Sequence, residues 1–303
     1  MAFSSQPLPP PPSGWFAHRH AVLRDGALAV LFTDRDIDDE YRRWLAARDG
    51  NAGHQRRLDF SGTRARLSVV GEDVAINVPV MLWAAIDRFP DGRWLIAARR
   101  ANAGEANGVI FAPDGTRQKA IALGDGIGHL GCAADGSIWV GYFDEGVFGA
   151  TVGSGGLVQF DERGHPLWSF NDHVADWQEA ICDCYAMAIC DNAIWSCSYT
   201  GFAIVRTEQG KVTRWVNRVA GAKAIAVDGQ FVLLAGGYES EAANLSVLEL
   251  GTHDARLIGT ATCAALTGAS LLQGRGSTIH VVNGGIWTRI RVRDVLGQLT
   301  EAS

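Results

Sequence analysis

The stretch Ala134-Asp135-Gly136-Ser137-Ile138-Trp139-Val140-Gly141 decides the fold, because one apolar run enters an Asp-Gly pair and a second apolar run leaves it. Asp-Gly between hydrophobic runs is a strong hairpin signal, and a type I′ turn there needs positive φ at both central residues. The signal, with Asp-Gly or a close substitute at its centre, recurs along the chain. The other copies are centred at Asp25-Gly26, Asp91-Gly92, Asp191-Asn192, Asp228-Gly229 and Arg275-Gly276.

A second glycine-containing turn follows each of these turns, so that every unit has the order strand, turn, strand, loop, strand, turn, strand. The spacing between copies averages about 50 residues, the scale of propeller repeats. A propeller arranges such four-stranded sheets around a channel and leaves only short protected edges. The sequence therefore predicts an all-β, six-bladed β-propeller with antiparallel blades. Their predicted bounds are 17–80, 81–125, 126–176, 177–219, 220–262 and 263–303.

Two insertions interrupt the repeat and are expected to be short helices. The segment 33–45 begins with Thr33, Asp34 and further acids and continues with apolar residues at helical spacing. The segment 171–181 has the same character over a shorter length. Closure of the ring has two alternatives, since the last blade can be completed by the N-terminal segment or by Gln298-Leu299-Thr300.

Composition bounds the partners. With 303 residues, 47% apolar residues and 36 glycines, the chain can build a large core with many tight turns. The net charge of −6, with no basic patch, argues against nucleic acid. No apolar run approaches the ~18 residues of a membrane span. Residues 1–14 have no signal-peptide pattern and are expected to be a Pro-rich flexible tail before a single domain at 15–303 of a cytoplasmic protein.

Four of the six cysteines lie close together in sequence and need a test against a metal site. If Asp191-Asn192 is a two-residue turn, Cys190 pairs with Ala193 and Ala186 faces Cys197. Cys184 and Cys190 are then about 20 Å apart on one strand, too far for one metal ion. We expect buried thiols here, and no metal site at these cysteines, Cys182 included. The imidazoles of His18 and His20 are expected on one strand face, and we expect no metal site there either.

The motif from Asp135 to Gly141 resembles the repeat of two-component-regulator-type propellers, and Asp191 to Ser196 resembles it less closely. The layout of the whole chain is similar to the NHL and SMP-30-like group. The stretch Gly141 to Gly149 resembles uncharacterised bacterial propeller-like proteins, which implies no activity. Among SMP-30-type lactonases and related lyases, the resemblance implies a divalent cation held by acidic and Asn side chains at the channel. Glu145, Asp183 and Asn217 or Asn283 could take part in such a site.

Ligands of propellers bind where the inner strands begin and the second strands end, so polar residues at those positions are the candidates for ligand binding. One hypothesis pairs His129 with Tyr142 across a hairpin and places Asp144 beside them, so that the carboxylate would raise the pKa of a His acting as general base. Each candidate also has a structural interpretation as a strand, turn or ion-pair residue. The candidates are His129, Tyr142, Asp144, Glu145, Asp183, Tyr185, Tyr199, Lys223, Tyr238 and Glu239.

Three functions remain open at this point. The first is a non-catalytic scaffold that binds a small molecule or a protein through one face of the ring. The second is an SMP-30-like lactonase, hydrolase or lyase with a divalent cation (Ca²⁺ or Zn²⁺), or a His–carboxylate pair, at the channel mouth. The third is a subunit of a larger assembly that uses the tail and residues 34–47 as contacts. Acids clustered with His129 around the mouth would favour the enzyme, and an apolar plug would favour the scaffold. Fold class alone does not decide between them.

Overall fold

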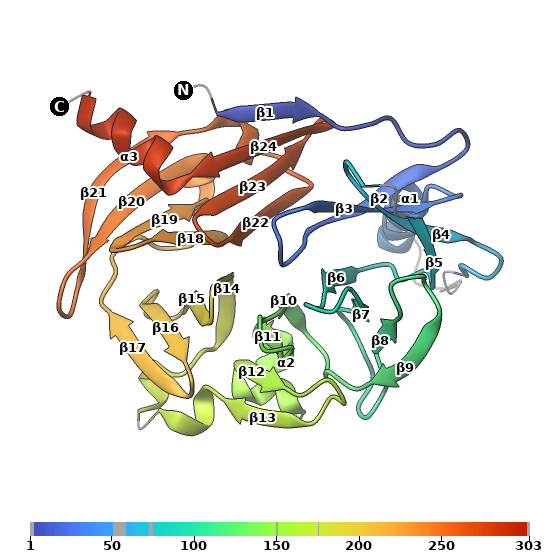
Figure 1. The fold of residues 1–303 in the computed structure, drawn as a ribbon, viewed down its shortest axis with the longest axis horizontal. Coiled ribbons are helices and arrows are strands. Elements are labelled where there is room, and N and C mark those ends of the chain that lie inside the picture. Colours follow the sequence, from blue (N-terminus) through green and yellow to red (C-terminus); the bar gives the residue numbers. More distant parts are fainter. Residues whose placement is uncertain (1–2, 51–58, 73–74, 150, 175, 302–303) are drawn as a thin grey trace.

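The computed structural model describes residues 3–50, 59–72, 75–149, 151–174 and 176–301. Within them the chain forms six four-stranded antiparallel sheets arranged as blades of a ring (Figure 1). Five blades follow chain order from the inner to the outer strand, as the repeat predicts. The predicted six-bladed β-propeller is confirmed. Each predicted blade range contains the strands of one sheet, except that the first sheet begins at Phe16 and that the outer strand of the sixth sheet comes from residues 4–7.

The strands fall into four classes by their place in the blade. The inner strands are β2 (Phe16–Val22), β6 (Ala84–Arg88), β10 (Ile127–Cys132), β14 (Asp183–Cys190), β18 (Ala224–Asp228) and β22 (Leu271–Arg275). The second strands are β3 (Leu28–Thr33), β7 (Trp94–Ala98), β11 (Ile138–Tyr142), β15 (Ala193–Tyr199), β19 (Phe231–Ala235) and β23 (Thr278–Asn283). The third strands are β4 (Ala65–Val69), β8 (Gly108–Phe111), β12 (Leu157–Phe160), β16 (Ile204–Glu208), β20 (Asn244–Leu250) and β24 (Ile286–Arg291). The outer strands are β5 (Ala75–Val78), β9 (Arg117–Ile121), β13 (Pro166–Ser169), β17 (Lys211–Trp215), β21 (Ala255–Thr262) and β1 (Ser4–Pro7).

The Asp-Gly turns have a different geometry from the predicted type I′. At Asp25-Gly26 only the glycine has a positive φ, of 83°. The amide of Gly26 donates to the carbonyl of Leu23, and the amide of Leu23 donates to that of Ala27, both at 2.9 Å. These bonds define a three-residue loop with the glycine in the left-handed region. Asp25 is left free to accept a hydrogen bond from the amide of Ala27. The position of the turn was predicted correctly and its type was not.

The N-terminal segment closes the ring. Strand β1 pairs with β24, from Ser4 opposite Arg289 to Pro7 opposite Ile286, and supplies the outer strand of the sixth blade. Residues 4–7, predicted as part of a flexible tail, are therefore part of the propeller. The alternative strand at Gln298–Thr300 is wrong, because these residues belong to helix α3 (Val292–Glu301). Val292 and Val295, three residues apart, bury one helical face against the fifth and sixth blades.

The predicted helix in the first insertion is confirmed as α1 (Ile37–Gly50), with Ile37 buried and three acids in the first turn, where they favour a helix. The second insertion forms two single turns, η2 (Asn171–His173) and η3 (Trp177–Glu179), instead of one helix. Asn171 explains the interruption, because its amide group bonds the backbone of both Ser154 and Ile181. The remaining short elements are α2 (Asp144–Val147), η1 (Val152–Gly155), η4 (Glu239–Glu241) and η5 (Ala264–Leu266).

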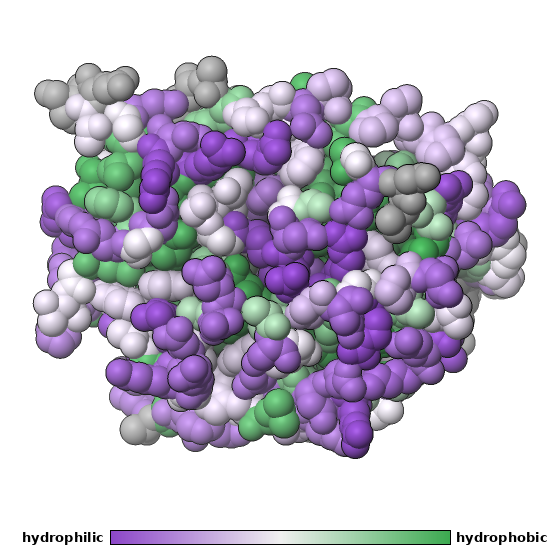
Figure 2. All heavy atoms as spheres, viewed as in Figure 1, coloured by the Kyte–Doolittle hydropathy of each residue, from purple (hydrophilic) through white to green (hydrophobic). Residues whose placement is uncertain are grey.

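The apolar core lies between blades and consists of clusters that each join two neighbours. Tyr142 and Phe160 lie in the cluster shared by the second and third blades. The cluster between the sixth and first blades is small and contains Val22, Leu28 and Trp287. The surface in the view of Figure 2 is mostly hydrophilic, with hydrophobic residues in scattered patches. In the described part of the chain, none of the helices has both the length and the hydropathy needed to cross a membrane.

The ring is irregular at the fifth blade. The amide of Gly276, after β22, donates to the carbonyl of Ile189 in β14 at 3.0 Å, so the inner strands of the fourth and sixth blades meet directly. Strand β18 reaches the same turn, because the amide of Val227 donates to the carbonyl of Gly276 at 3.0 Å. The channel is consequently lined mainly by the inner strands of the other five blades.

Candidate functional site

Inner strands begin and second strands end at one end of the ring, which we call the channel mouth, and the ten candidate residues belong to these strand ends or to the adjoining loops. Asp183 is the first residue of β14, and Tyr199 is the last residue of β15. Lys223 precedes β18, whereas Asp144 and Glu145 open α2 directly after β11. The repeat places these residues, because every blade runs in the same direction through the ring.

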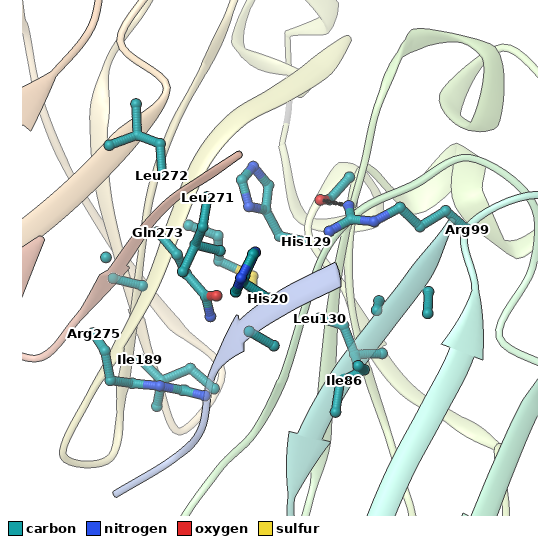
Figure 3. A pocket seen from close by; sticks show the side chains of 17 residues that line it. His20, Ile86, Arg99, His129, Leu130, Ile189, Leu271, Leu272, Gln273 and Arg275 are labelled. Carbon is teal, nitrogen blue, oxygen red and sulfur yellow. Dashed lines mark hydrogen bonds between the residues drawn. The ribbon is translucent and has the colours of Figure 1, made fainter. Parts of the chain in front are cut away.

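A cavity of about 120 Å³ lies in the channel below this mouth. Its apolar walls come from inner-strand residues such as Ile86, Leu130 and Ile189. Its polar side chains are His20, Arg99, His129, Gln273 and Arg275. Figure 3 shows the His20 ring in the middle of this group, with Arg99 and His129 on one side and Gln273 and Arg275 on the other. The channel is thus neither an apolar plug nor a cluster of acids.

His129 lies among cations and carbonyl groups. Burial, and next the charge of Arg99, lower the pKa of its imidazole from 6.5 to about 4. The backbone carbonyls of Tyr185 and Cys184 act in the opposite direction. A carboxylate partner would have raised the pKa of His129. The geometry therefore does not support the hypothesis that His129 and a carboxylate form a general base. His129 is a neutral imidazole at pH 7.

The predicted neighbourhood of His129 and Tyr142 is wrong. A bulge at Gly128 shifts the register, so that His129 pairs with Gly141 and Tyr142 pairs with Ile127. The Tyr142 side chain is fully buried and its hydroxyl donates to the carbonyl of Leu123. Burial raises the pKa of this phenol well above its ordinary value. Tyr142 is a core residue and does not face the mouth.

Four aromatic rings and a lysine form a cluster at the mouth, between the fourth and fifth blades. Tyr185 stacks on Tyr199 with 6.0 Å between ring centroids, and the hydroxyl of Tyr238 donates to that of Tyr185 at 3.0 Å. Phe202 packs against all three tyrosines. The Nζ of Lys223 lies 3.9 Å from the centroid of Tyr185. Tyr199 and Tyr238 remain 43% and 42% exposed, so the cluster offers apolar ring surface to solvent.

Asp183 is an acid close to this cluster, because the pKa of the Tyr185 phenol is raised by the hydrogen bond with Tyr238, by burial and also by the charge of Asp183. Burial, and next repulsion from Asp144, raise the pKa of its carboxyl from 3.8 to about 6, although Lys223 acts in the opposite direction. A carboxyl with this pKa is partly protonated at slightly acidic pH. The charge of the mouth therefore becomes more positive as the pH falls through 6.

Replacing Asp183 with asparagine is expected to stabilise the fold at pH 7.5 and to have little effect at pH 4. Between 3.8 and 6 the folded protein binds more protons at this carboxyl than the unfolded chain does, so stability falls as the pH rises through that window. After discounting for solvent exposure, the gain at pH 7.5 is on the order of 0.5–1 kcal/mol. Urea unfolding at both pH values measures it, and an equal change at both would contradict the assignment.

The implied metal site is not formed by the residues that could make it. Glu145 forms an ion pair with Arg100. Asn217 and Asn283 use their amide groups to bond backbone carbonyls, Asn217 at 2.9 Å from both Phe202 and Val219. Among the described residues, no group of three or more His, Cys, Asp or Glu side chains is placed to hold a metal ion. Glu239 is exposed and opens η4, directly after Tyr238.

The two imidazoles of His18-Arg19-His20 do not share surroundings, because a bulge at residues 17–19 separates them. The Nδ1 of His18 lies 2.9 Å from a carboxylate oxygen of Asp38, and its Nε2 lies 3.0 Å from the carbonyl oxygen of Met81. His18 thereby connects α1 to the ring. His20 lines the cavity, and burial lowers its pKa to about 4. The predicted common face is wrong.

The cysteine geometry follows the prediction. Cys190 pairs with Ala193, and Ala186 pairs with Cys197, so Cys184 and Cys190 lie near opposite ends of β14. Cys184 and Cys197 are buried free thiols, and burial raises the pKa of each to about 12. These thiols are too poorly ionised to act as nucleophiles.

Sequence reasoning missed three residues of this region. Arg99 follows the end of β7 and reaches into the cavity, where its Nη1 donates to the carbonyls of Ile127 and Gly128. Phe202 has a positive φ of 51° after β15, which aims its ring at the tyrosines. Gln273 forms hydrogen bonds with the backbone of Val22 in the neighbouring first blade. Arg99 lies in the loop that follows a second strand, as Asp144 and Tyr238 do, so the criterion used for them could have found it.

No family model matches the chain, and no curated protein matches it. Solved structures of propeller proteins match nearly its whole length. A catalytically inactive virginiamycin B lyase from Staphylococcus aureus with quinupristin is 10% identical, with a TM-score of 0.51 over 96% of this chain and 99% of that chain. A PQQ-bound aldose sugar dehydrogenase from Streptomyces coelicolor is 11% identical, with a TM-score of 0.50 over 96% and 98%. The Cps50 (Swd1) β-propeller domain of Myceliophteria thermophila is 10% identical, with a TM-score of 0.50 over 94% and 99%. At this identity the likeness shows the fold alone.

Proposed function

We propose that this protein is a binding module that takes a small molecule at the channel mouth, with the rings of Tyr185, Tyr199 and Tyr238 as its contact surface. The aromatic cluster carries this proposal. Tyrosine rings that are held by their neighbours and still exposed offer contact area at little cost in conformational entropy. A planar or sugar ring fits such a surface by stacking.

The position of the cluster favours a small molecule over a protein partner. Tyr185 belongs to β14, whose backbone carbonyls at 184 and 185 also face His129 in the cavity wall. His129 thus links the wall of the cavity of about 120 Å³ to the strand that carries Tyr185. A flat protein surface would contact the rings without using the cavity. A small ligand can occupy both.

The enzyme alternatives gain nothing from this geometry. The imidazole of His129 is neutral, with Arg99 as the charged group that most lowers its pKa, and Glu145 is held by Arg100. We therefore assign no reaction to the site and treat the mouth as a place of recognition.

The test is a thermal-shift screen with a panel of monosaccharides, nucleosides and aromatic acids, followed by calorimetry on any compound that stabilises the protein. A ligand that binds only the folded state raises the melting temperature. The double variant Tyr199→Ala/Tyr238→Ala is expected to weaken binding of such a compound at least tenfold, since loss of each ring contact costs about 1–3 kcal/mol and the variant removes two rings.

The matched control is Leu167→Ala, which removes an exposed side chain of β13 beside the Asp-Gly turns of the opposite face. It is expected to bind like the unmodified protein. If no compound of the panel binds, or if the tyrosine variant binds as tightly as the control, the proposal is overturned.

A further inference from the structure

The cavity below the mouth has an unbalanced charge. Its lining contains the ionisable side chains His20, Arg99, His129 and Arg275, all of them basic, and no aspartate or glutamate. Ligand sites usually combine apolar walls with a few convergent polar groups, and this cavity has that composition. The sign of its charge restricts what it can accept.

The positive charge of Arg275 is compensated by a carboxylate. Its guanidinium pairs with Asp87, which is fully buried behind it. The Nε of Arg275 is nevertheless buried and has no hydrogen-bond partner. A buried donor without an acceptor is costly, so this end of the cavity favours an added acceptor, either water or ligand.

In the part of the chain that the structure describes, no carboxylate pairs with Arg99. Its hydrogen bonds go to the backbone carbonyls of Ile127 and Gly128, which neutralise no charge. Burial, and next the charge of Arg19, lower the pKa of its guanidinium to about 10, so it stays protonated at neutral pH. Arg19 itself is paired with Asp38. The uncompensated positive charge therefore lies at Arg99.

The remaining groups can add donors without adding charge. His20 and His129 both have a pKa of about 4 and are neutral imidazoles at pH 7. A neutral imidazole offers one N–H donor. Lys223 stands at the mouth above Tyr185, and it is a second cation close enough to lower the pKa of His129. Together these groups favour an acceptor with negative charge.

We infer that the ligand of the proposed site is an anion, and that its carboxylate or phosphate group enters the cavity between Arg99, His129 and His20 while its ring lies on the tyrosines. This inference rests on the proposed function for the ring and on the cavity for the anion. The volume of about 120 Å³ holds several waters or one compact oxyanion. Charge-assisted hydrogen bonds from Arg99 then supply most of the orientation.

Inorganic phosphate and malonate are the probes, each compared with potassium chloride at equal ionic strength. Both oxyanions are expected to raise the melting temperature and to bind in calorimetry. Arg99→Met is expected to weaken phosphate binding at least tenfold. The control Arg117→Met removes an exposed cation of β9 and is expected to bind phosphate as the unmodified protein does. Binding of malonate alone would assign the cavity to carboxylates, and binding of phosphate alone would assign it to phosphate groups.

A second measurement uses the unmodified protein, so it does not depend on whether Arg99→Met folds. Bound phosphate is expected to raise the pKa of His20 and His129 above about 4, which histidine-labelled NMR titrations record directly. Unchanged titrations, or equal effects of phosphate and chloride, would overturn the inference. Ring compounds without charge that bind while both oxyanions fail would overturn it and leave the proposed function standing. If the oxyanions bind and Tyr199→Ala/Tyr238→Ala changes the binding of no ligand, the proposed function is overturned and the anion-binding cavity stands.

Discussion

Replacing Asp87 with alanine is expected to lower the free energy of unfolding by about 3–5 kcal/mol, because it leaves the buried Arg275 guanidinium unpaired. Asp87 is 0% exposed and joins four blades. One carboxylate oxygen accepts from the amide of Arg24 at 2.8 Å in the first blade, and the other accepts from the amide of Cys132 at 2.7 Å in the third. Arg275 adds the sixth blade.

Urea unfolding of Asp87→Ala measures this loss, with Glu162→Ala as the matched control. Glu162 also pairs with an arginine, Arg93, but is half exposed, and such a pair contributes about 1 kcal/mol or less. The double variant Asp87→Ala/Arg275→Met is expected to be more stable than Asp87→Ala, since the orphaned cation is gone. A loss below about 1 kcal/mol for Asp87→Ala would contradict the role assigned to it.

Gly274→Ala is expected to prevent the normal packing of the ring, with a loss above about 4 kcal/mol or failure to give soluble protein. A Cβ on Gly274 would lie 1.7 Å from the carbonyl oxygen of Ile225 in β18. The obstructing atom is backbone, so it cannot turn aside as a side-chain end could. The strands β22 and β18 would have to separate at the place where the ring is already irregular.

Gly297→Ala is the matched control for this prediction. Gly297 lies in α3, and a Cβ there would meet nothing within 4 Å. Alanine in place of glycine inside a helix stabilises by up to about 1 kcal/mol. Denaturation midpoints of the two variants are compared with that of the unmodified protein. A soluble Gly274→Ala with an unchanged midpoint would mean that the two backbones are not in close contact.

The protonation states of the titratable groups in and near the channel depend on their surroundings in the folded ring. His20 and His129 are neutral because they are buried next to arginines, and Asp183 is partly protonated near pH 6 because it is buried beside Asp144. Burial in the folded ring is the first cause of each shift, and for His129 and Asp183 the next cause is a charged residue of another element. The proposed anion would reverse the effect of Arg99 on His129, which is why the titrations of the histidines report on the occupied cavity.

The local sequence determined the architecture. Asp-Gly pairs or close substitutes between apolar runs located the hairpins of six blades at a repeat of about 50 residues, because turn chemistry acts over four or five residues. The direction of each strand placed Asp183, Tyr185, Tyr199 and Tyr238 at one mouth. The same patterns located the helix at 37–50, whose caps and acids are also local signals.

Tertiary structure decided what local patterns do not encode. Only the folded ring shows that β1 completes the last blade, since Ser4 and its partner Arg289 are 285 residues apart and either candidate strand was acceptable locally. A bulge at Gly128 in β10 separated His129 from Tyr142 and left His129 in the channel, because a shift of one residue reverses the face of the side chains that follow it on that strand. The charge of the cavity was likewise decided in space, because Arg99 lies beside His129 only after two blades have packed together.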